Sequence, residues 1–159
     1  EHPAYISALA KSVREFWEES KKAEKLLFSF HGIPKDYVIK GDPYEEQCLR
    51  TAALLSDELS LGEDEWQVAF QSRLGRQEWL KPYTSEMLEQ LGVEKLPSLD
   101  VLAPGFAVDC LETVDEIARE GCKEFQNSGG GELRYIPALN ATSLHVEALK
   151  EILLEGYKK

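Results

Sequence analysis

The sequence is short of positive charge. It contains 18 Lys and Arg residues against 29 Asp and Glu residues, so its formal net charge at pH 7 is −11. A surface of this sign repels the phosphate groups of nucleic acids and the headgroups of anionic lipids. Charge therefore argues against a nucleic-acid partner and against strong attraction to a membrane surface.

Long apolar runs are also absent. The longest candidates, Leu26–Phe30 and Val101–Val108, are the size of β-strands and far below the ~20 residues that a membrane-spanning helix needs. At 159 residues and 43% hydrophobic content, with six Phe, six Tyr and three Trp, the chain is too apolar to be disordered. We expect one soluble, globular domain.

Cysteine is scarce. Cys48, Cys110 and Cys122 are an odd number without a Cys-x-x-Cys pair, which predicts neither a zinc site nor a disulfide framework. A reducing compartment, the cytoplasm, fits this usage best. The chain begins Glu1-His2-Pro3, without an initiator Met or a targeting segment, as expected of a piece of a longer protein or a trimmed chain.

Two motifs of common enzyme classes are missing. The run Gly129–Gly131 precedes a predicted strand, whereas a phosphate-binding loop follows a strand and opens a helix. No Gly-x-Ser-x-Gly segment exists, so a serine hydrolase of the nucleophile-elbow type would lack its nucleophile. The pattern favours neither nucleotide binding nor serine hydrolysis.

The apolar periodicity predicts helices that alternate with strands. A leading amphipathic helix runs from Pro3 to about Lys25. Short apolar runs predict four strands, and amphipathic segments predict a helix after each: strands 26–31, 66–72, 99–103 and 133–136, and helices 44–59, 84–91, 109–125 and 142–157. Alternation with short loops predicts an α/β fold with a parallel sheet of four strands, covered on both faces.

His31 is the most informative residue. It ends the first predicted strand, and ligands of open parallel sheets bind at the carboxyl ends of the strands. An imidazole there can take a proton or bind a metal near neutral pH. A hydrogen-bonded histidine with no chemical role is the competing interpretation. His2 is terminal and His145 lies in a polar run of the last helix, so neither competes with His31.

Three carboxylates form a second pattern. Glu112, Glu116 and Glu120 lie four residues apart, within an arc of about 80° on an α-helix. Like charges so placed repel one another unless they share a cation or a proton. The competing interpretation is a solvated helix face with Arg119 nearby.

Trp79 and Cys110 carry weaker signals. Trp79, with Leu80, Pro82 and Tyr83, provides either a flat apolar wall for a ligand or ordinary core packing. Cys110, close to Glu112, is either a soft metal ligand or a buried thiol.

Taken together, five segments closely resemble the ferrochelatase family, in the same order along the chain. They are Ser29-Phe30-His31-Gly32-Ile33-Pro34, Phe70-Gln71-Ser72-Arg73-Leu74-Gly75, Trp79-Leu80-x-Pro82-Tyr83-Thr84, Pro104-Gly105-Phe106-Ala107-x-Asp109-Cys110-Leu111-Glu112-Thr113 and Tyr135-Ile136-Pro137-Ala138-Leu139-Asn140. The resemblance runs through the whole chain and is to the carboxyl-terminal half of these enzymes. It implies a chelatase-like three-layer α/β/α lobe over residues 26–159, preceded by a leading helix over residues 1–25, with the amino-terminal lobe absent.

The resemblance also implies insertion of Fe²⁺ into protoporphyrin IX, the last step of haem synthesis. Under it, His31 and Glu112 are the catalytic pair and also metal ligands, Glu116 and Glu120 are further metal-binding carboxylates, and Gln71, Ser72 and Trp79 bind the porphyrin. Fe²⁺ is then a substrate, and membrane association is at most peripheral. Family members differ at the position of Cys110, where some carry His. We expect no iron–sulfur cluster, since no cysteine follows Cys122.

The chemistry of metal insertion suits these residues. Two pyrrole protons must leave while a hydrated cation arrives from the other side of the ring, which calls for a base and a carboxylate facing each other. Two alternatives stay open. One is a half-size tetrapyrrole chelatase in which two copies pair to rebuild the cleft, and the other is a module that binds porphyrin or metal without turnover.

Overall fold

The computed structural model describes residues 1–157. It confirms the predicted α/β class: the sheet has four parallel strands in the order β2-β1-β3-β4. The strands are β1 (Lys25–His31), β2 (Trp66–Gln71), β3 (Ser98–Leu102) and β4 (Glu132–Ile136). The register places His31 beside Gln71, at the carboxyl ends of β1 and β2.

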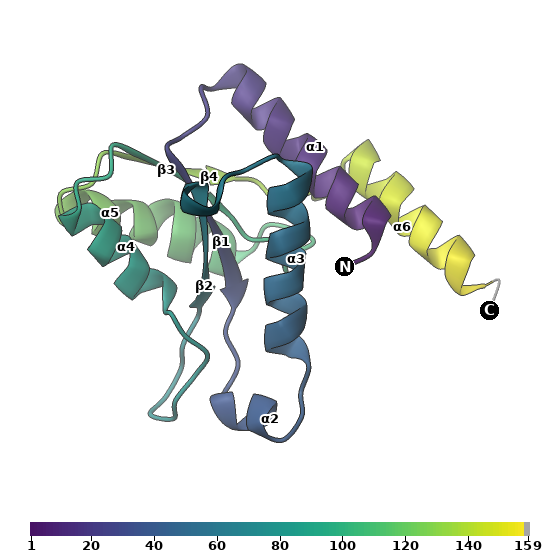
Figure 1. The fold of residues 1–159 in the computed structure, drawn as a ribbon, viewed down its shortest axis with the longest axis horizontal. Helices are drawn as coiled ribbons and strands as arrows, with labels where there is room; N and C mark the ends of the chain where they lie inside the picture. The colour runs from purple at the N-terminus through teal and green to yellow at the C-terminus, as the bar shows by residue number, and fades with distance from the viewer. Residues whose placement is uncertain (158–159) are drawn as a thin grey trace.

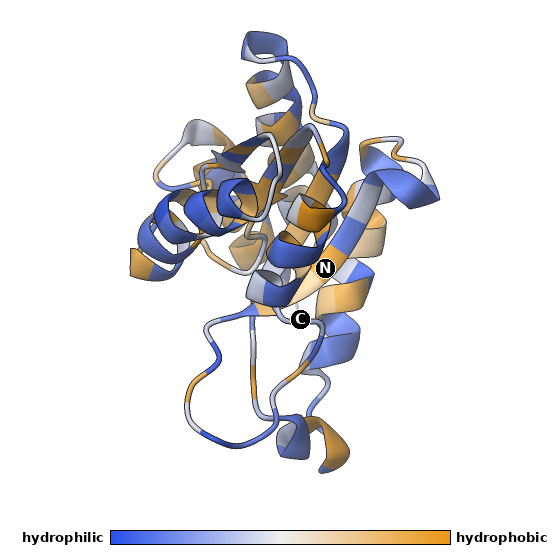
Figure 2. Ribbon diagram, turned by 90° about the vertical axis from the view of Figure 1, so that its left-hand side faces the viewer, coloured by the Kyte–Doolittle hydropathy of each residue, from blue (hydrophilic) through white to orange (hydrophobic). Residues whose placement is uncertain are grey.

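Helices cover both faces of the sheet (Figure 1). One face carries α1 (Pro3–Glu19), α3 (Tyr44–Glu58) and α6 (Ser143–Gly156); the other carries α4 (Thr84–Val93), η2 (Leu111–Gly121) and α5 (Cys122–Asn127). The hydrophobic residues gather in the strands and on the inner sides of the helices (Figure 2). Within the described range, none of the helices is long and apolar enough to span a membrane.

Alternation along the strands determines which helices each side chain meets. In β1, Phe28 and Phe30 belong to the hydrophobic cluster that includes α1 and α3, whereas Leu27 belongs to the cluster that includes α4, η2 and α5. Successive strand side chains point to opposite faces. Ser29 and His31 therefore lie on the same side as Leu27, toward α4 and η2.

The leading helix is six residues shorter than the predicted segment to Lys25. It ends at Glu19, and the backbone N–H and the hydroxyl of Ser20 both donate to the carbonyl of Phe16. Ala23 then donates its N–H to the carboxylate of Asp100 in β3 (3.2 Å). This tertiary bond draws the chain out of the helix, although lysine and alanine have good helix propensity.

The prediction of a single α-helix over residues 109–125 is wrong in the type of helix. Leu111–Gly121 forms a π-helix, η2, and only Cys122–Asn127 is α-helical. Two short helices, α2 (Lys35–Ile39) and the 3₁₀ helix η1 (Glu63–Glu65), lie where the sequence indicated loops. The other helices and strands differ from the predicted bounds by one or two residues.

The glycine run between α5 and β4 has a packing role. A Cβ on Gly131 would lie 2.0 Å from the carbonyl oxygen of Pro97, and one on Gly130 would lie 2.4 Å from the ring of Phe125. Backbone approaches this close leave no room for a side chain. The run is explained by contacts within the fold.

Candidate active site

Two segments project beyond the carboxyl ends of β1 and β2: the one that carries α2 and the loop that precedes α4 (Figure 1). They are tied together by an antiparallel bridge between Pro34 and Trp79. Leu80 donates its N–H to the carbonyl of Ile33, and Lys35 donates to the carbonyl of Glu78, both at 3.0 Å. The bridge fixes Trp79 beside the end of β1.

His31 is partly buried and flanked by two aromatic rings. The ring centroids of Trp79 and Phe106 each lie 6.3 Å from that of His31. A Cβ on Gly32 would come within 3.1 Å of the Trp79 ring, so a glycine after His31 lets the indole pack there. Trp79 Nε1 is buried and finds no hydrogen-bond partner among residues 1–157.

The hydrogen bond of His31 favours one tautomer. Nδ1 lies 2.7 Å from the backbone carbonyl oxygen of Gly32. A carbonyl only accepts, so Nδ1 must carry the proton in this bond, and the lone pair of the neutral ring is then on Nε2. The imidazole is thus arranged to accept a proton at Nε2.

Glu112 lies in the first turn of η2, partly exposed, close enough to His31 for their charges to interact. A hydrogen bond from the thiol of Cys110 and a second one from the backbone N–H of Glu112 lower the pKa of the Glu112 carboxyl. Burial acts in the opposite direction, and His31 in its protonated form adds the smallest lowering. Glu112 is therefore ionised at neutral pH. Sequence analysis did not foresee that Cys110 is its hydrogen-bond donor.

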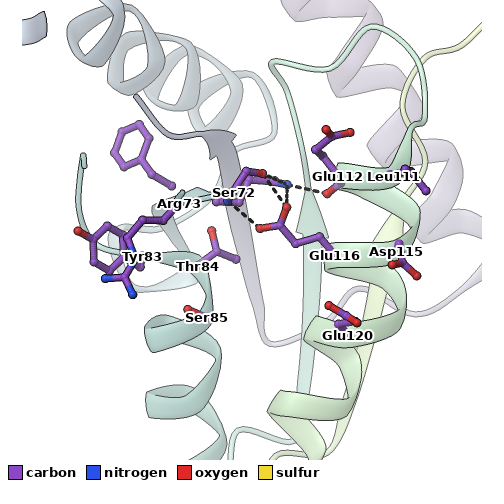
Figure 3. Close-up of a pocket in the computed structure, with 12 residues that line it drawn as sticks. Ser72, Arg73, Tyr83, Thr84, Ser85, Leu111, Glu112, Asp115, Glu116 and Glu120 are labelled. Atoms are coloured by element: carbon purple, nitrogen blue, oxygen red, sulfur yellow. Dashed lines mark hydrogen bonds between the residues drawn. The ribbon is translucent and has the colours of Figure 1, made fainter. Parts of the chain in front are cut away.

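The three predicted carboxylates lie on successive turns of η2, and the side chain of Glu116 points toward Ser72 at the end of β2 (Figure 3). Bonds in a π-helix join residues five apart, so residues four apart lie nearly one above another instead of spreading over an arc. Glu112, Glu116 and Glu120 line a pocket of about 500 Å³ together with Gln71 and Ser72.

The structure does not bring every predicted residue into that pocket. His31 and Trp79 pack against each other beside it and are not among its lining residues. Residues 1–157 contain no group of three or more His, Cys, Asp or Glu side chains placed to hold a metal ion.

Asp109 fixes the start of η2. Its carboxylate accepts hydrogen bonds from Tyr135 Oη (2.8 Å), Asn140 Nδ2 (2.8 Å), Thr113 Oγ1 (3.2 Å) and the N–H of Ala138 (3.2 Å). Burial raises the pKa of this carboxyl, but the four hydrogen bonds outweigh that effect and hold the pKa below its usual range. Asp109 thus links η2 to β4 and to the loop that follows it.

His145, predicted to lie in a polar run of the last helix, is not exposed in the structure. It is buried, with 5% of its surface exposed, and its Nδ1 lies 2.6 Å from the carbonyl oxygen of Asn140. Asn140 also accepts a hydrogen bond from the N–H of Asp109 (2.9 Å). This buried position is consistent with the interpretation that His31, and not His145, is the candidate catalytic histidine.

Comparison with known proteins gives one family. A family model described as Ferrochelatase matches residues 1–157. The chain is 50% identical over 153 residues to the ferrochelatase of Nitrosococcus oceani, covering 96% of this chain and 42% of that protein. It is 53% identical over 152 residues to that of Thioalkalivibrio sulfidiphilus (96% and 41%) and 51% identical over 159 residues to that of a Psychrobacter species (98% and 47%). The chain spans less than half the length of these relatives. A match over residues 1–157 places the chain in the ferrochelatase family.

Proposed function

We propose that this chain is the catalytic half of an enzyme that inserts Fe²⁺ into protoporphyrin IX to form protohaem. The observation that carries the proposal is the position of His31 at the carboxyl end of β1, with its Nε2 free to accept a proton and the ionised carboxylate of Glu112 nearby. The relatives named ferrochelatase support the same reaction.

The reaction needs a base and a place for the cation. Metal-free porphyrin loses two N–H protons as Fe²⁺ binds its four nitrogens, so the products are haem and two protons. His31 Nε2 accepts a pyrrole proton, and Glu112 attracts the cation or the second proton. Fe²⁺ is a substrate here and needs no permanent site in this lobe.

Flat apolar surfaces suit a macrocycle. Trp79 and Phe106 flank His31, and rings of this kind bind planar ligands by stacking and by apolar burial. Glu120 lies further along η2 and is exposed, so we assign it to the approach of Fe²⁺ from solvent. The partners of this chain are thus protoporphyrin IX, Fe²⁺ and an amino-terminal lobe that supplies the opposite wall of the cleft.

We assign no iron–sulfur cluster to this segment, because no cysteine follows Cys122. A net charge of −11 and three unpaired cysteines favour a cytoplasmic location with at most peripheral membrane association.

The proposal is tested on the complete protein that contains this segment. The complete protein is incubated without oxygen with protoporphyrin IX and Fe²⁺. It should convert the fluorescent free porphyrin into haem, which is measured as a loss of porphyrin fluorescence and a gain of haem absorbance. Porphyrin binding without metal insertion would instead identify a binding module. If the 159-residue chain alone forms an active dimer, the half-size chelatase is correct. If the complete protein neither binds porphyrin nor forms haem, the proposal is wrong.

A further inference from the structure

Glu116 is in contact with the end of β2, and this contact indicates a role other than metal binding. We propose that Gln71, Ser72 and Glu116 form a clamp, here called the β2 clamp, that holds η2 against β2 and so positions Glu112. The consequence for catalysis rests on the proposed function, whereas the clamp itself is a property of the fold.

Both carboxylate oxygens of Glu116 accept a hydrogen bond from Ser72. The backbone N–H of Ser72 donates to Oε1 (2.7 Å), and its hydroxyl donates to Oε2 (2.6 Å). A hydroxyl bond this short is typical of a charge-assisted hydrogen bond to a carboxylate. Gln71 Nε2 also donates to Oε2, at a longer distance of 3.4 Å. Figure 3 shows the side chain of Glu116 directed at Ser72.

The backbone of Ser72 adopts a conformation that needs support. Its φ is +64°, in the left-handed region, which is unfavourable for a residue other than glycine. This conformation turns the chain sharply at the end of β2, where its N–H meets Glu116. The two bonds to Glu116 are what holds Ser72 in this state.

Gln71 provides the second half of the clamp. Its side chain is buried, with 3% of the residue surface exposed. Gln71 Oε1 accepts from the hydroxyl of Ser29 in β1 (2.8 Å), and Nε2 donates to the backbone carbonyl of Glu112 (2.6 Å). Ser29 Oγ lies 2.8 Å from Thr84 Oγ1 at the start of α4. Hydrogen bonds thus connect α4, β1, β2 and η2 in series.

The clamp holds η2 at two points, the backbone of Glu112 and the side chain of Glu116. Two contacts on adjacent turns fix both the rotation of the helix and its displacement along the axis. The position of the Glu112 carboxylate relative to His31 follows from both. Glu116 is therefore a positioning residue that acts through its two hydrogen bonds to Ser72.

A glutamine at position 116 separates hydrogen bonding from charge. Its amide oxygen can accept from the N–H of Ser72, and its NH₂ group can donate to the Ser72 hydroxyl, so the clamp persists without the charge. Alanine removes both bonds. A carboxylate that passes protons or Fe²⁺ to Glu112 would instead lose its function in either variant.

The experiment compares Glu116→Gln and Glu116→Ala in the complete enzyme. Glu116→Gln should keep kcat within about threefold of wild type, with an unchanged pH profile. Glu116→Ala should lose about 10- to 100-fold in kcat with little change in KM for Fe²⁺, because small misplacements of a catalytic group have effects of this size. Amide hydrogen exchange, measured without porphyrin or iron, should be faster at Ser72 and over residues 111–121 in Glu116→Ala alone. Glu124→Ala, an exposed position on α5, is the matched control and should leave this exchange unchanged.

Equal losses in both variants, with a raised KM for Fe²⁺ and a shifted pH profile, would overturn the clamp in favour of a relay. Unchanged exchange in Glu116→Ala would overturn it as well. The exchange measurement does not depend on the reaction, so the clamp is tested even if the complete enzyme forms no haem. In that case the proposed function is wrong, and the amide hydrogen exchange alone decides whether the clamp exists.

Discussion

Glu112→Gln and His31→Ala in the complete enzyme are each expected to slow insertion of Fe²⁺ by about 10²- to 10⁴-fold, the usual contribution of a general acid or base. Glu112→Gln keeps the shape of the side chain but removes the charge that the hydrogen bonds from Cys110 and the local backbone N–H stabilise. His31→Ala removes the nitrogen whose lone pair is free. Both residues are partly exposed, so melting temperatures should stay within about 2 °C of wild type.

The double variant adds a sharper criterion. If the two groups act as a unit across one ring, the double variant should be about as slow as the slower single variant, because effects within a catalytic unit do not add. Glu124→Gln, which neutralises an exposed carboxylate on α5, is the control and should react at the wild-type rate. A His31→Ala enzyme with near-wild-type kcat would remove His31 from the mechanism.

Asp100→Ala should destabilise the protein by about 3–5 kcal/mol, the usual result of leaving a buried charge without its partner. Asp100 is fully buried in β3 and accepts from Arg134 Nε (2.8 Å), from Trp17 Nε1 (2.7 Å) and from the N–H of Ala23. Its removal leaves the Arg134 side chain, only 16% exposed, without its carboxylate. These bonds also tie the end of α1 to the amino-terminal edge of the sheet.

Thermal melting of the complete enzyme measures this effect. The expected decrease in melting temperature is roughly 3–10 °C, because the complete enzyme is about twice as long as this chain and a longer protein shifts less for each kcal/mol. Asp100→Ala combined with Arg134→Met should melt higher than Asp100→Ala alone, because the second change removes the unpaired charge. Glu24→Ala, an exposed position at the same edge, should change stability by less than about 0.5 kcal/mol. An Asp100→Ala protein that melts like the Glu24→Ala control would show that the network adds nothing.

The sheet could be predicted because its strands are buried on both faces. Leu26–Phe30 and Leu99–Leu102 are continuous apolar or mostly apolar runs between polar turns, which is typical of parallel strands in α/β proteins. The rule that ligands bind at the carboxyl ends of such strands then selected His31, and the family resemblance added Gln71 and Ser72. The structure places these residues side by side, at the ends of β1 and β2.

The π-helix could not be predicted in the same way. The apolar spacing of Leu111–Gly121 suits an α-helix, and the extra residue in each turn has no periodic signature over so short a segment. The contacts of η2 are with residues far away in the sequence, such as the bond from Gln71 to the Glu112 carbonyl. For the same reason, the spacing of the glutamates could not predict the hydrogen bonds of Glu116. The spacing indicated only a row of carboxylates that repel one another.

His145 shows the limit of reading polarity from the sequence. It stands between Leu144 and Val146, with Thr142 and Ser143 before it, and histidine has only an intermediate tendency to be buried. The structure buries it because its Nδ1 meets the carbonyl of Asn140, whose backbone is itself in the left-handed region. A contact that depends on the unusual backbone conformation of a loop cannot be predicted from the periodicity of a helix.

The most direct test of the central claim is a structure of the complete enzyme with metal-free protoporphyrin IX bound. The account predicts that the macrocycle lies against His31 and Trp79, with its central nitrogens between His31 Nε2 and the carboxylate of Glu112. A second pocket, of about 420 Å³ and lined by Tyr5, Tyr44 and Cys48 among others, provides the alternative location. A macrocycle in that pocket, with His31 and Glu112 away from its nitrogens, would contradict the assignment of both residues.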